Sequence, residues 1–159
     1  MNIFLSLVAV FGICSNSFAS AAVSSAHRIH ALRLKPGADP RVALVAYAKE
    51  HKLKALSVLS AVGSLNKSVL RFADQKAATT LLGPREVVSL SGTISLDGPH
   101  LHLSLADATG AVVGGHLAEG SQVFTTLELV LLELSDLEFR RPLDLATGHG
   151  ELEIRKRGP

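Results

Sequence analysis

The sequence predicts an α+β fold, a compact and mostly antiparallel β-sheet domain with one early helix. Helical spacing of apolar residues is confined to one segment near the start of the chain. From residue 67 onward, β-branched and leucine-rich runs alternate with turn residues. The chain has 159 residues, 47% of them hydrophobic, which suits one domain with a sizeable core.

The first predicted strand covers residues 28–34, where apolar and polar residues alternate, and residues 35–37 form a turn after it. Asp39 and Pro40 then predict the start of the helix, because Asp caps a helix and Pro suits its first position. Apolar side chains continue at helical spacing to about residue 51 or 52. We therefore expect one helix of about three turns.

Seven further strands are predicted from apolar runs bounded by turn residues. The run at 55–62 resembles a buried strand that ends at Gly63. The others are expected at 69–72, 87–96, 101–106, 111–117, 123–134 and 151–154. Because no internal repeat or linker is evident, we expect the mature chain to form a single domain.

A hairpin is predicted between the strands at 101–106 and 111–117. Asp107 and Gly110 stand at the first and fourth positions of a type I turn, and residues 108–110 fit a three-residue loop with glycine in the left-handed position. Counting back from this loop pairs His102 with His116. A register slip of one residue would turn His116 to the opposite face.

Three histidines then share one face of this hairpin. His100 and His102 stand two residues apart, and side chains at that spacing lie on the same face of a strand. With His116 they form a set of three imidazoles, the donor set of catalytic zinc sites that keep one position open. Gly114 and Gly115 leave room for a ligand or a backbone segment to approach. The opposite face of the strand at 101–106 is predicted to be apolar, with leucines at 101, 103 and 105.

The two ends of the chain differ from the rest. Residues 1–21 contain no charged side chain and include an apolar run from residue 3 to 13, which is typical of a secretory signal peptide. We expect cleavage after Ala21, or after Ala19, and a secreted or periplasmic mature protein with no membrane segment. A buried N-terminal helix is the alternative. Residues 156–159 are predicted to be a solvated basic tail.

Several motifs resemble the PPC (plant and prokaryote conserved) domain family. The similarity spans about residues 31–154, within a domain that we place at 28–155. The motifs include Asp97-Gly98-Pro99-His100-Leu101-His102 and Gly114-Gly115-His116-Leu117, with further matches at 32–37, 59–65, 90–95, 125–128, 141–144 and 147–148.

The resemblance implies a fold, an assembly and a cofactor. PPC domains are α+β proteins that assemble as trimers, and in prokaryotic-type members histidines matching His100, His102 and His116 look like a zinc site. Plant members lack these histidines and carry AT-hooks for DNA binding, so this chain resembles the prokaryotic type. A more distant similarity is to acetolactate decarboxylases, which also use a His-x-His then Gly-Gly-His zinc site.

Three further residues are candidates for chemistry beside the metal. Glu128 is a candidate acid–base group, because a buried carboxylate in a long apolar strand is unusual and needs a partner. Arg33 and Arg71 are candidates for orienting an anionic substrate, and a salt bridge or a subunit contact is the alternative for each. The remaining histidines, at 27, 30, 51 and 149, are interpreted as ordinary surface residues.

These observations leave three functions open, and they leave open whether the protein is an enzyme. The first is an exported metal-binding protein, with zinc as the expected ion and a small oxygenated molecule as substrate. The second is a non-enzymatic trimeric interaction module. The third is DNA binding, which the mixed charges, the net charge of +2 and the few aromatic residues do not favour. Nickel, cobalt and iron also accept imidazole ligands.

Overall fold

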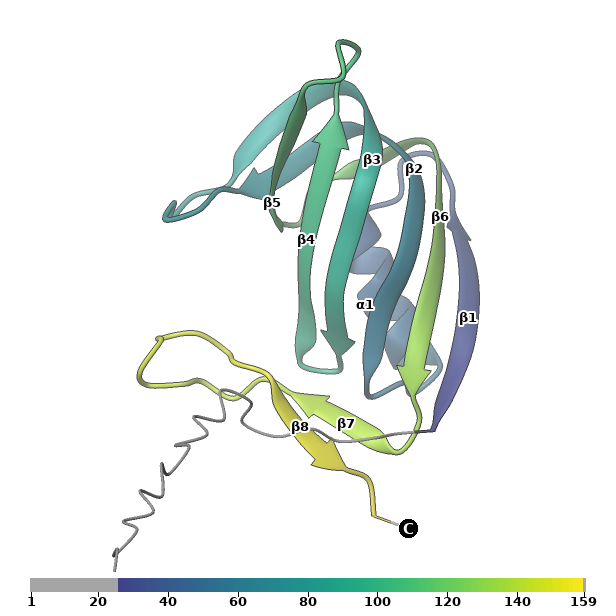
Figure 1. Cartoon of the computed structure of the whole chain (residues 1–159), viewed down its shortest axis with the longest axis vertical. Helices are drawn as coiled ribbons and strands as arrows, with labels where there is room; N and C mark the ends of the chain where they lie inside the picture. The colour runs from purple at the N-terminus through teal and green to yellow at the C-terminus, as the bar shows by residue number, and fades with distance from the viewer. Residues whose placement is uncertain (1–25, 159) are drawn as a thin grey trace, which may run out of the picture.

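The computed structural model describes residues 26–158 and contains one helix and two antiparallel sheets (Figure 1). The larger sheet has six strands and the smaller has two. The α+β prediction of a mostly antiparallel sheet with one early helix is confirmed. In chain order the elements are β1 (His27–Leu34), α1 (Pro40–Glu50), β2 (Leu56–Arg71), β3 (Thr79–Ser95), β4 (Gly98–Ala106), β5 (Val112–Leu117), β6 (Gln122–Leu134), β7 (Leu137–Arg140) and β8 (Glu153–Lys156).

The larger sheet closes on itself at one end. Its strands lie in the order β1-β6-β2-β3-β4-β5, and β2 also pairs with β5. In this extra ladder Leu70 pairs with Leu117, and Arg71 pairs with His116. Strand β2 is 16 residues long: β3 pairs along one of its edges, and β6 and then β5 pair with successive parts of the other edge. The closure therefore lies beside one of the three predicted metal ligands.

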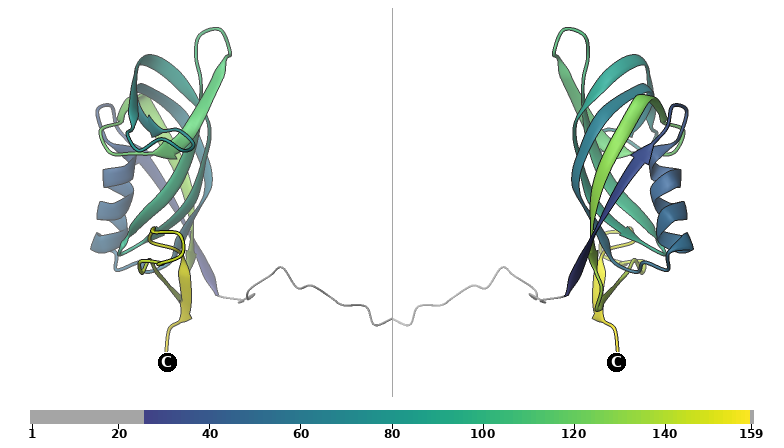
Figure 2. Two further views of the ribbon diagram at one scale, coloured as in Figure 1. Left: turned by 90° about the vertical axis from the view of Figure 1, so that its left-hand side faces the viewer. Right: turned by 90° about the vertical axis from the view of Figure 1, so that its right-hand side faces the viewer.

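Helix α1 covers one face of the larger sheet, as the two side views show (Figure 2). The Asp39 carboxylate accepts hydrogen bonds from two backbone N–H groups of the first turn, and Pro40 is the first helical residue. Leu44 and Ala48 are fully buried and belong to the main core. The helix ends at Glu50, close to the expected end.

The core between α1 and the sheet is aliphatic, and β4 shows how it orients the histidines. Leu101, Leu103 and Leu105 are at most 3% exposed. The predicted alternation along this strand is therefore confirmed. Because successive side chains point to opposite faces, the side chains of His100 and His102 lie on the face away from the core.

The expected end of a strand at Gly63 is wrong, because the segments at 55–62 and 69–72 belong to one continuous strand, β2. Gly63 has a φ of +149°, and a Cβ there would collide with the backbone carbonyl of Thr126 on β6. The glycine therefore permits a close approach of two strands rather than a turn. Strand β3 likewise begins at Thr79 rather than at residue 87, because its first residues pair with the far half of β2.

The sequence did not predict β7, which pairs with β8 in the smaller sheet. Four residues are too few to show a clear period, and β8 lies two residues later than expected. Leu137 and Phe139 of β7 are buried in a second small core with Ala55. We refer to residues 137–156 as the C-terminal arm.

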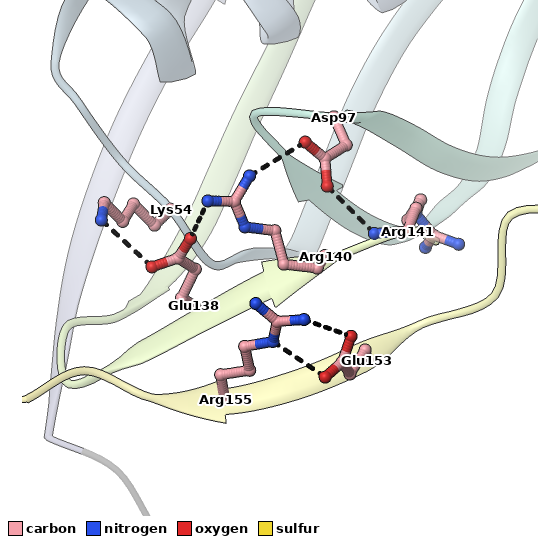
Figure 3. A network of polar contacts seen from close by, with 7 residues as sticks. All are labelled: Lys54, Asp97, Glu138, Arg140, Arg141, Glu153 and Arg155. Atoms are coloured by element: carbon pink, nitrogen blue, oxygen red, sulfur yellow. Dashed lines mark hydrogen bonds and ion pairs between the residues drawn. The ribbon is translucent and has the colours of Figure 1, made fainter. Parts of the chain in front are cut away.

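Ion pairs connect the C-terminal arm to the rest of the domain (Figure 3). Arg140 pairs with Asp97 in the β3–β4 turn at 3.3 Å. Lys54 pairs with Glu138 at 3.1 Å. The Asp97 carboxylate also accepts a hydrogen bond from the backbone N–H of Arg141 at 3.0 Å. These contacts hold the start of the arm against the end of the sheet that carries His100.

The terminal expectations have different outcomes. The predicted signal peptide, residues 1–21, lies outside the described residues. Lys156 belongs to β8, and Arg157 donates its backbone N–H to the Asp136 carbonyl at 2.7 Å. Residues 156–158 are exposed. No helix within residues 26–158 is long and apolar enough to cross a membrane.

Candidate metal centre

The β4–β5 hairpin has the register that its turn residues predict. Gly110 has a φ of +83° and donates its backbone N–H to the Asp107 carbonyl at 2.9 Å. The Asp107 side chain accepts two further hydrogen bonds from backbone N–H groups of the loop. These bonds fix the loop length, and His102 pairs with His116 in the ladder.

The imidazoles of His100, His102 and His116 converge at this hairpin. One ring nitrogen from each residue lies within 4.8 Å of those of the other two. The Nε2 atoms of His100 and His102 are 3.3 Å apart, and the ring centroids of His100 and His116 are 5.3 Å apart. His100 and His102 are exposed and His116 is half-buried. The structure therefore brings the three predicted ligands together with their rings accessible from one side.

Gly114 and Gly115 allow backbone segments, rather than a ligand, to come close. A Cβ on Gly115 would lie 2.8 Å from the Arg71 carbonyl oxygen on β2. A Cβ on Gly114 would lie 2.9 Å from the Leu103 carbonyl oxygen on β4. Both separations are too short for a real Cβ, so any side chain here would push β5 away from its two neighbours. The glycine pair therefore helps to set the position of His116.

Three residues are candidates for chemistry beside the metal, and of these only Arg71 lies next to the histidines. It is the ladder partner of His116, and its side chain lines a pocket with His100 and His116. Its Nη1 is 3.5 Å from the backbone carbonyl oxygen of Gln75. The side chain is half-buried, and no ion pair forms between it and a carboxylate within residues 26–158.

The C-terminal arm lies beside the histidines and forms two adjoining pockets with them. One pocket, of about 270 Å³, is lined by His100, His102, Arg141 and Glu151 together with residues 91–93 of β3. The second, of about 290 Å³, shares His100, Arg141 and Glu151 with the first and is also lined by Arg71, His116 and His149. The arm is more than 20 residues away from the histidines in sequence. Only the fold therefore brings Arg141 and Glu151 next to the three imidazoles.

Sequence reasoning missed Arg141 and Glu151 as site residues. Arg141 Nη2 donates to the Thr93 hydroxyl at 2.7 Å, and its Nη1 donates to the Gly150 carbonyl at 3.3 Å. The Nε atom is buried without a hydrogen-bond partner among the described residues. The one sequence signal for Arg141 is its position at the start of a PPC-like motif. Glu151 lies in a segment predicted to be a strand, and that prediction gives no sign of a site residue.

The surroundings of His116 and His100 favour neutral imidazoles, the form that binds metals. Burial, followed by the charges of His100 and Arg71, lowers the pKa of His116 to about 4. Burial and the charge of Arg141 lower the pKa of His100, and the Glu151 carboxylate partly opposes this shift. Both rings therefore remain deprotonated near neutral pH.

The donor set itself fits a transition metal. Three imidazoles suit zinc and its neighbours, whereas calcium and magnesium prefer oxygen ligands. The Nδ1 atom of His116 is buried and has no hydrogen-bond partner within the described part of the chain. Among the described residues, one hydrogen bond joins His100 Nε2 and His102 Nε2, whereas none joins His116 to either ring.

Glu128 and Arg33 lie elsewhere, and the expectation that Glu128 is buried is wrong. Glu128 is exposed on β6, where its ladder partners are Arg33 on β1 and Val62 on β2. Its neighbours Leu127 and Leu129 point into the core, so the pleat turns the carboxylate outward. Arg33 is also exposed and donates from Nε to the Thr126 hydroxyl at 3.0 Å. Neither side chain lines the pockets at the histidines.

Among the other histidines, His30 differs from the expected surface residue. It is half-buried, and its ring bonds with the Tyr47 hydroxyl at 2.9 Å and the Glu133 carboxylate at 3.2 Å. Glu133 is 4% exposed, so this pair satisfies a buried carboxylate. His149 is exposed, yet it lines the second pocket.

Comparison with solved structures places the fold among known proteins. A hypothetical protein from Salmonella cholerae-suis is 43% identical, with a TM-score of 0.83 over 85% of this chain and 98% of that one. A metal-containing protein from Archaeoglobus fulgidus is 29% identical, with a TM-score of 0.71 over 82% of this chain and 95% of that one. A plant- and prokaryote-conserved (PPC) protein from Pyrococcus horikoshii is 26% identical, with a TM-score of 0.70 over 86% of this chain and 99% of that one.

Comparison with curated sequences and families gives a second line of evidence. The chain is 46% identical over 129 residues to the bifunctional protein GlmU of Synechococcus sp. strain JA-3-3Ab, a match that covers 81% of this chain. It spans only 21% of that protein's length. Residues 21–135 match the family described as the Plants and Prokaryotes Conserved (PCC) domain. The chain therefore belongs to the Plants and Prokaryotes Conserved domain family, the PPC family that its motifs resemble.

Proposed function

We propose that this protein holds a divalent metal ion, zinc, on His100, His102 and His116, and that the site takes a small oxygenated molecule. The observation that carries the proposal is the convergence of three imidazole nitrogens within 4.8 Å of one another. The similarity to a metal-containing archaeal protein of the same fold supports it. Three protein ligands leave a position open, as in catalytic rather than structural zinc sites.

A zinc ion at such a site supplies a Lewis acid for a bound oxygen atom and lowers the pKa of bound water. The chain's own residues would do the rest. Arg141 and Arg71 line the space beside the histidines and would orient a ligand, and Glu151 offers a carboxylate that could accept a proton. The pockets open beside the exposed rings of His100 and His102, so a small ligand has access to them.

We also propose that the protein assembles as a homotrimer through the outer face of β1, β6 and β2. On this face Ile29 is 56% exposed and Val62 is 63% exposed. A hollow of about 460 Å³ is lined there by Val62 and Val130 together with Arg33 and Glu128. Apolar side chains beside opposite charges suit a contact between copies of one chain, which is the alternative role considered for Arg33.

A third proposal is that the precursor is exported and processed. It rests on the uncharged, apolar composition of residues 1–21. N-terminal sequencing of exported material should find a chain that begins at Ala22. An intact Met1 on exported material would contradict processing.

Metal analysis of the purified protein tests the central proposal. We expect stoichiometric zinc in the wild type and its loss in His102→Ala. His27→Ala is the matched control, because His27 is exposed at the start of β1 and lies outside the three-histidine group. Equal and negligible metal in wild type and His102→Ala, after incubation with zinc, nickel, cobalt or iron, would refute the proposal.

A further inference from the structure

We propose that the ligand of this site carries a small oxyanion group, a carboxylate or a phosphate, which the guanidinium groups of Arg141 and Arg71 bind beside the histidines. The inference rests on the proposed metal site and specifies the class of molecule that the site accepts. It is argued from the positions of the two arginines, their charge and the size of the pockets.

The two arginines come from different elements of the fold and are held beside the histidines. Arg141 comes from the C-terminal arm, where hydrogen bonds to Thr93 and Gly150 fix its guanidinium. Arg71 comes from the end of β2, where the ladder with His116 fixes its backbone. Both side chains line the pocket that also contains His100 and His116. A ligand there could contact both arginines.

The positive charge of this region exceeds the negative charge that the protein places there. No carboxylate within residues 26–158 forms an ion pair with Arg71 or Arg141. Glu151 is the only acidic residue lining the two pockets. With a divalent ion on three neutral histidines, the pocket would hold four positive charges against one negative charge. Partly buried charge of one sign is costly unless it is paired, so an anionic ligand would be stabilised.

The hydrogen-bonding capacity points to the same class of ligand. A guanidinium presents five N–H donors in a planar fork that matches the oxygens of carboxylate and phosphate. Arg141 Nη1 and Nη2 carry two N–H donors each, and each donates one hydrogen bond to the protein's own acceptors. Donors therefore remain for oxygen atoms of a ligand.

The pocket volumes limit the ligand to a small molecule. The two adjoining pockets measure about 270 and 290 Å³ and share His100, Arg141 and Glu151. These volumes lie near the lower end of the range for small-molecule sites. They suit an organic acid or phosphate ester of a few heavy atoms.

Calorimetric titration of the metal-loaded protein tests the inference. The probes are acetate, malonate and inorganic phosphate, with chloride as a control anion without an oxygen fork. We expect saturable binding of at least one oxyanion to the zinc-loaded wild type. Arg141→Met and Arg71→Met should each weaken it about tenfold to a hundredfold, since each removes charge-assisted hydrogen bonds. If acetate or malonate binds more tightly than phosphate, the ligand group is a carboxylate; if phosphate binds more tightly, it is a phosphate.

The control variant is Arg28→Met, which removes an exposed arginine that lies outside both pockets and should bind the anion as the wild type does. Metal content is measured before each titration, so loss of the ion is separated from loss of the anion. Arg141→Met also removes the hydrogen bond to Thr93. If that variant fails to fold, Arg71→Met alone tests whether an arginine binds the anion.

Two results would overturn the inference. One is a zinc-loaded wild type that binds none of the oxyanions. The other is unchanged anion affinity in Arg71→Met and in folded Arg141→Met. Either result leaves the metal proposal intact, whereas a wild type that holds no metal refutes the proposed function instead. In that case titration of the metal-free protein decides whether the arginines bind the oxyanion.

Discussion

Arg71 and His116 are direct partners in the ladder by which β5 joins β2. On its other side His116 pairs with His102 of β4. The third histidine therefore lies where the sheet closes on itself, and the same closure brings an arginine from β2 to the candidate metal centre. The packing of β5 between β2 and β4 should thus control metal affinity, even at positions that cannot bind metal.

Gly115→Ala tests this dependence. The new Cβ would lie 2.8 Å from the Arg71 carbonyl oxygen and 3.4 Å from the Phe72 ring, so β5 must move. Overpacking of this kind costs about 1–3 kcal/mol, and we expect zinc affinity to fall about tenfold or more. Competition with a chelator measures the affinity. Gly158→Ala, where a Cβ meets no neighbour, is the control and should bind zinc as the wild type does. Unchanged affinity in Gly115→Ala would show that the site tolerates a displaced β5.

The hairpin was predictable because all of its information is local. Asp107 and Gly110 determine the loop, and the period of two along a strand then determines which residues share a face. The facing positions of His102 and His116 follow from these two facts alone. The leucines between the histidines supply an independent check, since they are buried as the same alternation requires.

The residues around the hairpin were not predictable from local pattern. Arg141 and Glu151 reach the pockets only because β7 and β8 pair and Asp97 anchors the arm. Gly63 was interpreted as a strand end, although its positive φ serves the close approach of β2 and β6. Glu128 was expected to be buried because its strand is apolar, but the pleat places it on the outer face. In each case the sequence pattern does not show which distant segment of the chain packs beside the residue, or which face of the sheet is covered.

Leu101 lies between two of the proposed ligands and is fully buried. Leu101→Ala should lower the free energy of unfolding by about 2–5 kcal/mol, because it removes buried side-chain contacts and leaves a cavity. Leu145→Ala is the control: Leu145 is 91% exposed in the arm, and its loss should change stability by about 0.5 kcal/mol or less. Urea unfolding of the metal-free proteins measures both. Similar values for the two variants would mean that β4 does not pack as described.

The proposed trimer predicts that Val62→Lys breaks the assembly. The substitution introduces a charge at an apolar, 63% exposed position on the outer face of β2, where it would be buried in the subunit contact. Light scattering coupled to size exclusion should give the mass of three chains for the wild type and of one chain for Val62→Lys. Val112→Lys changes an equally exposed valine on β5 and should remain trimeric. A wild type with the mass of one chain would contradict the proposal.

The ion pairs of Glu138 lead to a prediction of how acid affects the stability of the C-terminal arm. The hydrogen bond from Lys54 and the charge of Arg140 lower the pKa of the Glu138 carboxyl (Figure 3). A carboxyl whose pKa is lower in the folded protein than in the unfolded chain stabilises the fold above its unfolded pKa, and this contribution is lost as the pH falls through the folded value.

Glu138→Gln removes that charge while keeping the shape of the side chain. We expect it to lower the unfolding temperature at pH 7, where the wild-type carboxylate is ionised and paired. At acid pH, below this lowered pKa, the difference from wild type should shrink, because the wild-type carboxyl also becomes protonated there. Thermal unfolding of both proteins across this pH range measures the effect. Glu50→Gln, at the exposed end of α1, controls for a general loss of acidic charge. A destabilisation of the same size at both pH values would assign the effect of Glu138→Gln to packing rather than to the ionised carboxylate.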